Sequence, residues 1–218
     1  MIKIENYDVV GWEHAIRGMR NPMNSWEKSD SFEFPPDEDG VPYIGPNDYK
    51  LMKSLRESGT DHRKFMRMIT VYLDIVSPLY FLKELDTYKV GTVANSCSTM
   101  HKITEKEFVL DDFSHEHLGG KEKQILLTIV EAMNESRDAF VTWNEDYKHD
   151  KKDYWWQMIQ LLPSSYNQRR TLMLNYEVLA NIYKSRKDHK LDEWRDFCKW
   201  IKTLPYSELI TGEYDNGY

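Results

Sequence analysis

The amino-acid sequence predicts an α+β fold, and three observations support this class. Residues 65–75 alternate as a strand does, residues 121–148 space their apolar side chains as on a long amphipathic helix, and the expected strands do not alternate regularly with helices. Repeated βαβ units show such alternation, so we expect a small antiparallel or mixed sheet with long helices. The 218 residues fit one domain spanning 1–218.

The elements of the first half follow from apolar spacing and turn-forming residues. We expect a strand over residues 2–10, a helix over 11–20, an acidic loop over 24–46, a helix over 47–57, a strand over 65–75 and a helix over 78–86. Asn47 can cap the second helix. Both faces of the second strand carry apolar residues, which is typical of a strand covered on both sides.

The second half is expected to be mostly helical. We expect helices over 121–148, 169–184 and 191–202, an aromatic stretch over 154–156, and a frayed tail over 211–218. Residues 89–102 are small and polar and follow neither the helix nor the strand period. His115 and His117 form an H-x-H in a loop and could bind a metal only if a third ligand converged on them, so we expect no metal.

Composition excludes several classes of protein. The 29 basic and 36 acidic residues give a net charge of −7, which argues against a nucleic-acid coat. No apolar run approaches the ~20 residues of a membrane helix. The N-terminus lacks the basic and apolar segments of a secretory signal. Cys97 and Cys198 are too few for a disulfide scaffold, so we expect a cytoplasmic protein.

Four stretches, in order, carry motifs of one family. They are LMKSLRESGTDHRKFMR (51–67), PLYFLKE (78–84), residues 87–100, and Leu162-Pro163 continued through Asn175, Asn181 and Arg186-Lys187-Asp188. Together they resemble the flavin-dependent thymidylate synthases, the ThyX family. The family's corresponding patterns are G-H-x-[ST]-x-x-E-H, P-[LI]-[FY]-V-x-R-Q, R-H-R-x-x-S-x-N-x-x-S-x-R, and L-P followed by N and N-x-x-x-x-R-x-D.

The resemblance implies a fold, a reaction and an assembly. In the family, reduced FAD passes a methylene group from methylenetetrahydrofolate onto dUMP, NADPH reduces the flavin, and a homotetramer holds its active sites between subunits. The resemblance assigns cofactor binding to His62, Lys89, Asn95, Asn175 and Asn181, nucleotide binding to Lys83, Glu84, Arg169 and Arg186, and the family's serine position to Ser98 or Cys97.

The third stretch departs from the family pattern. Thr87 and Tyr88 stand on the family's Arg-His, and Lys89 alone keeps a charge. Two registers remain open for the rest, one placing Cys97 and the other Ser98 on the second serine, and neither keeps the final arginine. The loss of two arginines would remove about 3–6 kcal/mol of phosphate binding. Glu84 also replaces the family's Gln, and Ile159 its basic residue before L-P.

Several alternatives therefore stay open. Asn175 and Arg186 could flank an apolar stripe about 16 Å long that suits FAD, or that stripe could be ordinary core. His62 could contact the flavin or lie on the surface, and Cys97 could be a small buried residue. The leading hypothesis is thymidylate synthesis from dUMP. The alternatives are a non-catalytic scaffold that binds a nucleotide or a protein, and a flavoprotein with another substrate.

Overall fold

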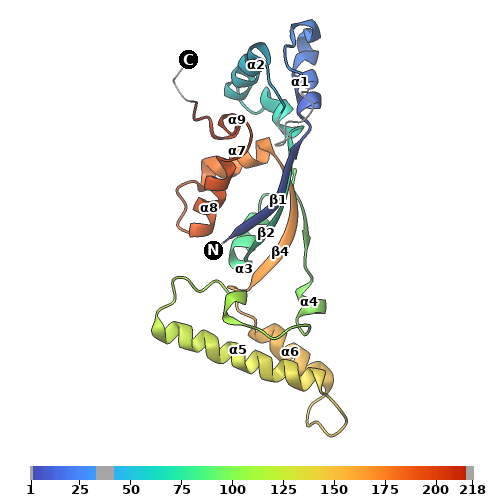
Figure 1. The fold of residues 1–218 in the computed structure, drawn as a ribbon, viewed down its shortest axis with the longest axis vertical. Helices are drawn as coiled ribbons and strands as arrows, with labels where there is room; N and C mark the ends of the chain where they lie inside the picture. Colours follow the sequence, from blue (N-terminus) through green and yellow to red (C-terminus); the bar gives the residue numbers. More distant parts are fainter. Residues whose placement is uncertain (1, 33–41, 215–218) are drawn as a thin grey trace. The chain divides into compact units, whose positions relative to one another are not determined.

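The computed structural model describes residues 2–32 and 42–214. Within them, four strands form one antiparallel sheet in the order β1-β2-β4-β3 (Figure 1). The strands are β1 (Lys3–Val10), β2 (Thr70–Pro78), β3 (Val93–Ser96) and β4 (Asn167–Asn175). The α-helices are α1 (Trp12–Arg20), α2 (Pro46–Glu57), α3 (Leu79–Leu85), α4 (Thr99–Lys102), α5 (Gly120–Val141), α6 (Lys151–Leu161), α7 (Tyr176–Arg186), α8 (Asp192–Ile201) and α9 (Glu208–Thr211). The α+β class is confirmed.

The chain divides into two compact units. Unit 1 comprises residues 1–3, 75–86 and 95–170, and unit 2 comprises residues 4–74, 87–94 and 171–218. Strands β2 and β4 contribute residues to both units. The expectation of a single domain over the whole chain stays a prediction. Within the described residues, no helix is long and apolar enough to cross a membrane.

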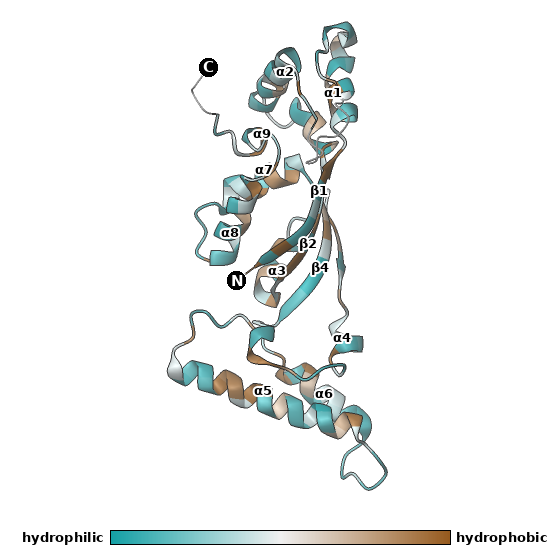
Figure 2. Ribbon diagram, in the orientation of Figure 1, coloured by the Kyte–Doolittle hydropathy of each residue, from teal (hydrophilic) through white to brown (hydrophobic). Residues whose placement is uncertain are grey.

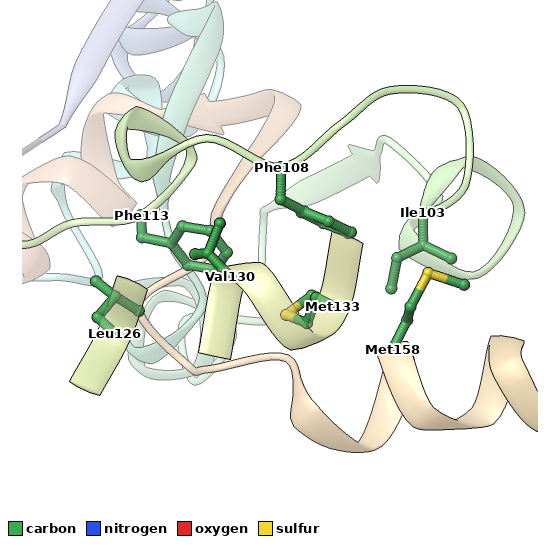
Figure 3. Close-up of a cluster of buried hydrophobic side chains, with 7 residues drawn as sticks. All are labelled: Ile103, Phe108, Phe113, Leu126, Val130, Met133 and Met158. Carbon is green, nitrogen blue, oxygen red and sulfur yellow. The ribbon is translucent and has the colours of Figure 1, made fainter. Parts of the chain in front are cut away.

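Unit 1 has its own apolar core on one side of helix α5 (Figure 3). Leu126, Val130 and Met133 follow the i, i+4, i+7 spacing of a buried helical stripe, and Met158 of α6 packs into the same cluster. The side-chain amide of Asn134 binds both backbone groups of Phe108, at 2.8 Å to its N–H and 2.9 Å to its carbonyl. Figure 2 shows apolar and polar residues interspersed along α5.

Helix α5 is shorter than predicted, and the aromatic stretch after it is helical. The prediction was wrong beyond Val141, where Thr142 ends the helix and donates its hydroxyl to the Asp138 carbonyl at 2.8 Å. The loop that follows is closed by Trp143, whose indole nitrogen donates to the His149 carbonyl at 3.0 Å. Residues 154–156 lie inside α6.

Strand β2 begins later than predicted. Residues 63–67 form a 3₁₀ turn instead, which buries the consecutive side chains Phe65 and Met66, and the strand starts at Thr70. The predicted inward face is confirmed, because Ile69, Val71, Leu73 and Ile75 are all fully buried. On the opposite face Tyr72 is 44% exposed, so within the described residues this face is covered only in part.

The predicted helix over 169–184 was wrong in its first part. Residues 167–175 form strand β4, and helix α7 starts at Tyr176. Leu172 and Leu174 are buried while Thr171 is exposed, which is the two-residue period of a strand. Residues 89–102, left unassigned by the sequence pattern, contain strand β3 and the short helix α4.

Asp30, rather than Asn47, caps helix α2. The helix begins at Pro46, and the Asp30 carboxylate accepts hydrogen bonds from the backbone N–H groups of Asn47 at 2.9 Å and Asp48 at 3.1 Å. Within the predicted loop over 24–46, Asp30 therefore makes hydrogen bonds to helix α2, and Trp26–Lys28 form a 3₁₀ turn. Its acidic run, residues 37–39, lies outside the described residues.

The last described residues of the chain are held by side-chain hydrogen bonds. The Glu213 carboxylate accepts hydrogen bonds from the Tyr183 hydroxyl and the Lys202 ammonium, both at 2.7 Å. The expectation of a frayed tail was therefore wrong for residues 211–214, and residues 215–218 lie outside the description.

A buried carboxylate organises the segment that follows α1. Asp48 is fully buried and accepts from the Arg20 guanidinium at 2.6 Å and from the hydroxyls of Ser29 and Ser31 at 2.7 Å each. Burial alone would raise the pKa of Asp48, but the hydrogen bonds from Ser31, Ser29 and Arg20 outweigh it and hold that pKa below its usual value.

We predict that Asp48→Asn lowers the free energy of unfolding by about 3–5 kcal/mol at pH 7, because Arg20 then stays buried without its counter-charge. Since the folded-state pKa is depressed, this stabilisation is present above the unfolded pKa and is lost as the pH falls below about 4. Urea unfolding at pH 7 and pH 3 measures both effects. Asp61→Asn, at an exposed turn, is the control, and an equal loss in both variants would contradict the prediction.

Candidate functional site

In unit 1 the predicted residues gather where strand β3 passes beside β4. The Cys97 N–H donates to the Arg169 carbonyl at 2.9 Å, and the Gln168 side chain donates to the Cys97 carbonyl at 2.9 Å and to the Thr99 hydroxyl at 3.1 Å. The structure thus brings Cys97 and Arg169 together. The sequence did not predict a role for Gln168, which lies on strand β4 just before the segment that was predicted to be helical.

The other unit 1 candidates have varied surroundings. Ser98 caps α4, and its hydroxyl accepts from the His101 N–H at 3.3 Å. Asn95 is exposed on β3. Lys83 and Glu84 lie on α3, where Lys83 is exposed and Glu84 half-buried. This part of the site therefore presents side chains of β3 and α4 to solvent.

Arg170 is held by an acidic partner in the same unit. Its guanidinium contacts Asp86 at 2.6 Å and the Gln168 side-chain oxygen at 3.1 Å. Arg169, its neighbour, points to the exposed side of the strand. Of the two arginines, Arg169 is the more accessible to an anion.

The two cysteines have opposite environments. Cys97 is exposed, so the expectation that it is a small buried residue was wrong, whereas Cys198 is 4% exposed. Burial, reinforced by the nearby Asp188 carboxylate, raises the pKa of Cys198 to about 11. The thiolate is the reactive form, so Cys198 is chemically quiet at neutral pH.

We predict that dithionitrobenzoate at pH 8 labels one thiol per folded chain rapidly, and that Cys97→Ser abolishes this reaction. Only about one Cys198 thiol in a thousand is ionised at that pH. The matched variant Cys198→Ser should keep the rapid phase. Equal rates for both thiols in the folded protein would refute the assignment.

In unit 2 the candidates lie along helix α7. Asn175 caps the helix, and its side-chain oxygen accepts from the Val178 N–H at 3.0 Å. Gly91, with a φ of 80°, packs on this cap so closely that a Cβ there would lie 2.8 Å from the Asn175 amide nitrogen. A side chain at position 91 is thus excluded, and the exposed Lys89 is carried on the same segment.

Arg186, at the last position of α7, is framed by aromatic rings. Its guanidinium carbon lies 4.8 Å from the ring centre of Trp194 and 5.7 Å from that of Tyr88. Its Nε donates to the Tyr88 hydroxyl at 3.0 Å, and its Nη1 lies 3.0 Å from Nε2 of His189. Tyr88 was noted only as a departure from the family pattern, yet here it orients the arginine predicted to bind nucleotide.

Asn181 joins an ion pair that the sequence did not predict. Arg63 contacts both carboxylate oxygens of Glu177, at 2.7 and 3.0 Å, and donates to the Asn181 side-chain oxygen at 3.3 Å. The Arg63 and Glu177 side chains are only 15% and 9% exposed. His62 precedes this pair and is itself exposed. The pair therefore neutralises Arg63 beside two of the predicted cofactor residues.

The H-x-H of residues 115–117 lies just before helix α5. Nδ1 of His115 lies 2.8 Å from the Phe113 carbonyl of its own loop. Across residues 2–32 and 42–214, no group of three or more His, Cys, Asp or Glu side chains is arranged to hold a metal ion.

We predict that Glu177→Gln lowers the free energy of unfolding by about 3 kcal/mol, because Arg63 loses its counter-charge in a site largely shielded from water. Glu105→Gln breaks a pair with Lys102 whose side chains are both more than half exposed, and it should cost less than 1 kcal/mol. Chemical denaturation measures both. A cost below 1 kcal/mol for Glu177→Gln would contradict the tight pair.

Of the comparisons with known proteins, the one with solved structures identifies the fold. No protein-family model matches the sequence, and no curated protein matches it. The structure is similar to the flavin-dependent thymidylate synthase ThyX from Helicobacter pylori complexed with FAD and dUMP, with a TM-score of 0.62, 18% identity and 95% of each chain covered. A second such ThyX structure with FAD and dUMP gives 0.62 and 17%, covering 95% of this chain and 94% of that one.

A methylase gives a similar match. The UMP/dUMP methylase PolB from Streptomyces cacaoi, bound with 5-Br dUMP, aligns with a TM-score of 0.58 and 13% identity, covering 97% of this chain and 95% of that one. At these identities the likeness shows the fold. The chain therefore has the ThyX fold over nearly its whole length, as the resemblance implied.

Proposed function

We propose that this protein is a flavin-dependent enzyme that methylates dUMP at C5 to give dTMP. The observation that carries the proposal is the fold, which matches over 95% of both chains a ThyX complexed with FAD and dUMP. The match to a UMP/dUMP methylase points to the same base. A cytoplasmic location would suit these substrates.

Residues of α7 would hold the cofactor. The amide nitrogens of Asn175 and Asn181 can donate to ribose or phosphate oxygens, since their side-chain oxygens already accept bonds from Val178 and Arg63. Lys89 is exposed on the segment packed against α7 and would meet the diphosphate as a point charge. His62 would contact the flavin from the turn before Arg63. These donors suit FAD, which supplies the electrons that reduce the transferred carbon, with NADPH as their source.

Nucleotide recognition would depend on a fixed arginine. The rings of Tyr88 and Trp194 immobilise the Arg186 guanidinium, so little side-chain entropy remains to be lost when it binds an anion. Arg169 and Lys83 would add charge for the phosphate, and Glu84 would accept from the sugar or base. Cys97 or Ser98 would line the base pocket, and Asn95 would face the cofactor. Methylenetetrahydrofolate would supply the carbon, in a homotetramer with sites between subunits.

A second candidate is a non-catalytic relative that keeps the scaffold and binds a nucleotide or a protein. One observation favours it: Glu177 places a carboxylate on α7 beside Asn181 and neutralises Arg63. That arrangement reduces the positive charge available to a diphosphate. A flavoprotein with another substrate would keep the FAD site and not the methylation.

We predict that the purified protein carries flavin absorbance that co-elutes with it, or gains it on reconstitution with FAD. With NADPH and methylenetetrahydrofolate it should then release the C5 hydrogen of dUMP as labelled water. Asn181→Leu, which removes the amide donor, should lose flavin, whereas Asn144→Leu, in the loop after α5, should not. Bound flavin without C5 release would favour another substrate, and a protein that does not bind FAD would overturn the enzyme proposal.

A further inference from the structure

A cavity of about 900 Å³ lies within unit 2, and its lining includes no residue assigned above to the cofactor or nucleotide. It is lined by the end of β1, one face of α1, residues 26–32 and 42–43, and the start of β2. Its size is that of a small-molecule site. Val9, Ile16 and Met68 are among its apolar lining residues.

Three aromatic side chains stand at the cavity with much of their surface exposed. Trp26 is 49% exposed, Phe32 51% and Tyr43 40%. The Phe32 and Tyr43 rings lie 4.9 Å apart at 41°, and the two residues form an isolated β-bridge. Rings left exposed around a cavity offer a stacking surface for a flat ligand.

The polar side of the cavity is rich in donors. Arg17 lies on α1, and its Nη2 is 3.3 Å from Nδ1 of His14. Because arginine only donates, this geometry leaves Nδ1 of His14 as the acceptor and its Nε2 as a second donor. Glu13 faces Arg17 at 3.9 Å with both side chains more than 60% exposed, so water screens that pair strongly. Arg20, also in the lining, is neutralised by Asp48.

Hydrogen bonds and one close approach hold the described backbone around the cavity in place. The Arg20 guanidinium donates to the carbonyls of Ser25 at 3.2 Å and Lys28 at 3.0 Å, in addition to its ion pair with Asp48. Gly11, with a φ of 94°, lets α1 start so close to the segment before β2 that a Cβ would lie 2.1 Å from the Met68 carbonyl oxygen. A rigid, concave wall with aromatic and cationic groups reduces the entropy lost on binding.

We propose that this cavity binds a planar aromatic anion, with its ring stacked against Trp26, Phe32 and Tyr43 and its carboxylate or phosphate bound by Arg17 and His14. This site is separate from the one in the proposed function. It stands whether or not the protein binds FAD and dUMP.

The test is calorimetric titration of the full chain with 2-naphthoate and with 2-naphthyl phosphate, which distinguish the two anions. We expect saturable binding of at least one of them at one site per chain, and at least tenfold weaker binding of the neutral analogue 2-naphthylmethanol. Arg17→Gln should weaken anion binding about tenfold, while Lys50→Gln, an exposed cation outside the cavity, should leave it unchanged.

Two further results decide the proposal. Saturating FAD and dUMP should leave naphthyl binding unchanged, and competition would overturn the separate site. Absence of saturable binding, equal affinity for the neutral analogue, or equal effects of Arg17→Gln and Lys50→Gln would also overturn it. Thermal unfolding of each variant, expected to match the wild type, excludes loss of folding as the cause.

Discussion

The side chain of Asn175 ends strand β4 and starts helix α7. Its oxygen caps the helix through the Val178 N–H, while the Tyr176 N–H next to it donates to the Ile69 carbonyl at 3.0 Å. Gly91 packs against the side chain of Asn175. A side chain at position 91 would clash with it, so glycine is required there. This one junction sets the direction of α7, and so it determines where Glu177, Asn181 and Arg186 stand.

The surroundings of α7 show how this chain differs from the pattern it resembles. Tyr88 stands where the family has a histidine, and its hydroxyl and ring both contact Arg186. Glu177 brings a carboxylate into the first turn, where the helix dipole favours it, and pairs with Arg63. The charge of Arg63 is thus neutralised within the protein by Glu177. The charge of Arg186 is instead held in place by aromatic rings. The proposed nucleotide site would therefore rely on fewer, better-positioned cations.

Sequence reasoning found the features that depend on local spacing. The buried face of β2 and the helix at 192–201 follow from periodicity, and the ThyX fold followed from four collinear motifs. It missed features fixed by distant partners. Residues 169–175 were predicted to be helical because the strand alternation of Leu172 and Leu174 is short, and β3 forms only through its pairing with β4. The Asp30 cap and the Arg63–Glu177 pair join residues far apart in sequence, which no periodicity encodes.

The proposed function depends on Arg186, fixed by Tyr88 and Trp194, binding a nucleotide although two family arginines are absent. We would titrate dUMP calorimetrically into the FAD-reconstituted protein. We expect saturable binding at one site per chain, weakened at least tenfold in Arg186→Gln and unchanged in Lys199→Gln, an exposed cation on α8. No saturable binding to the wild type, or equal affinity in both variants, would contradict it.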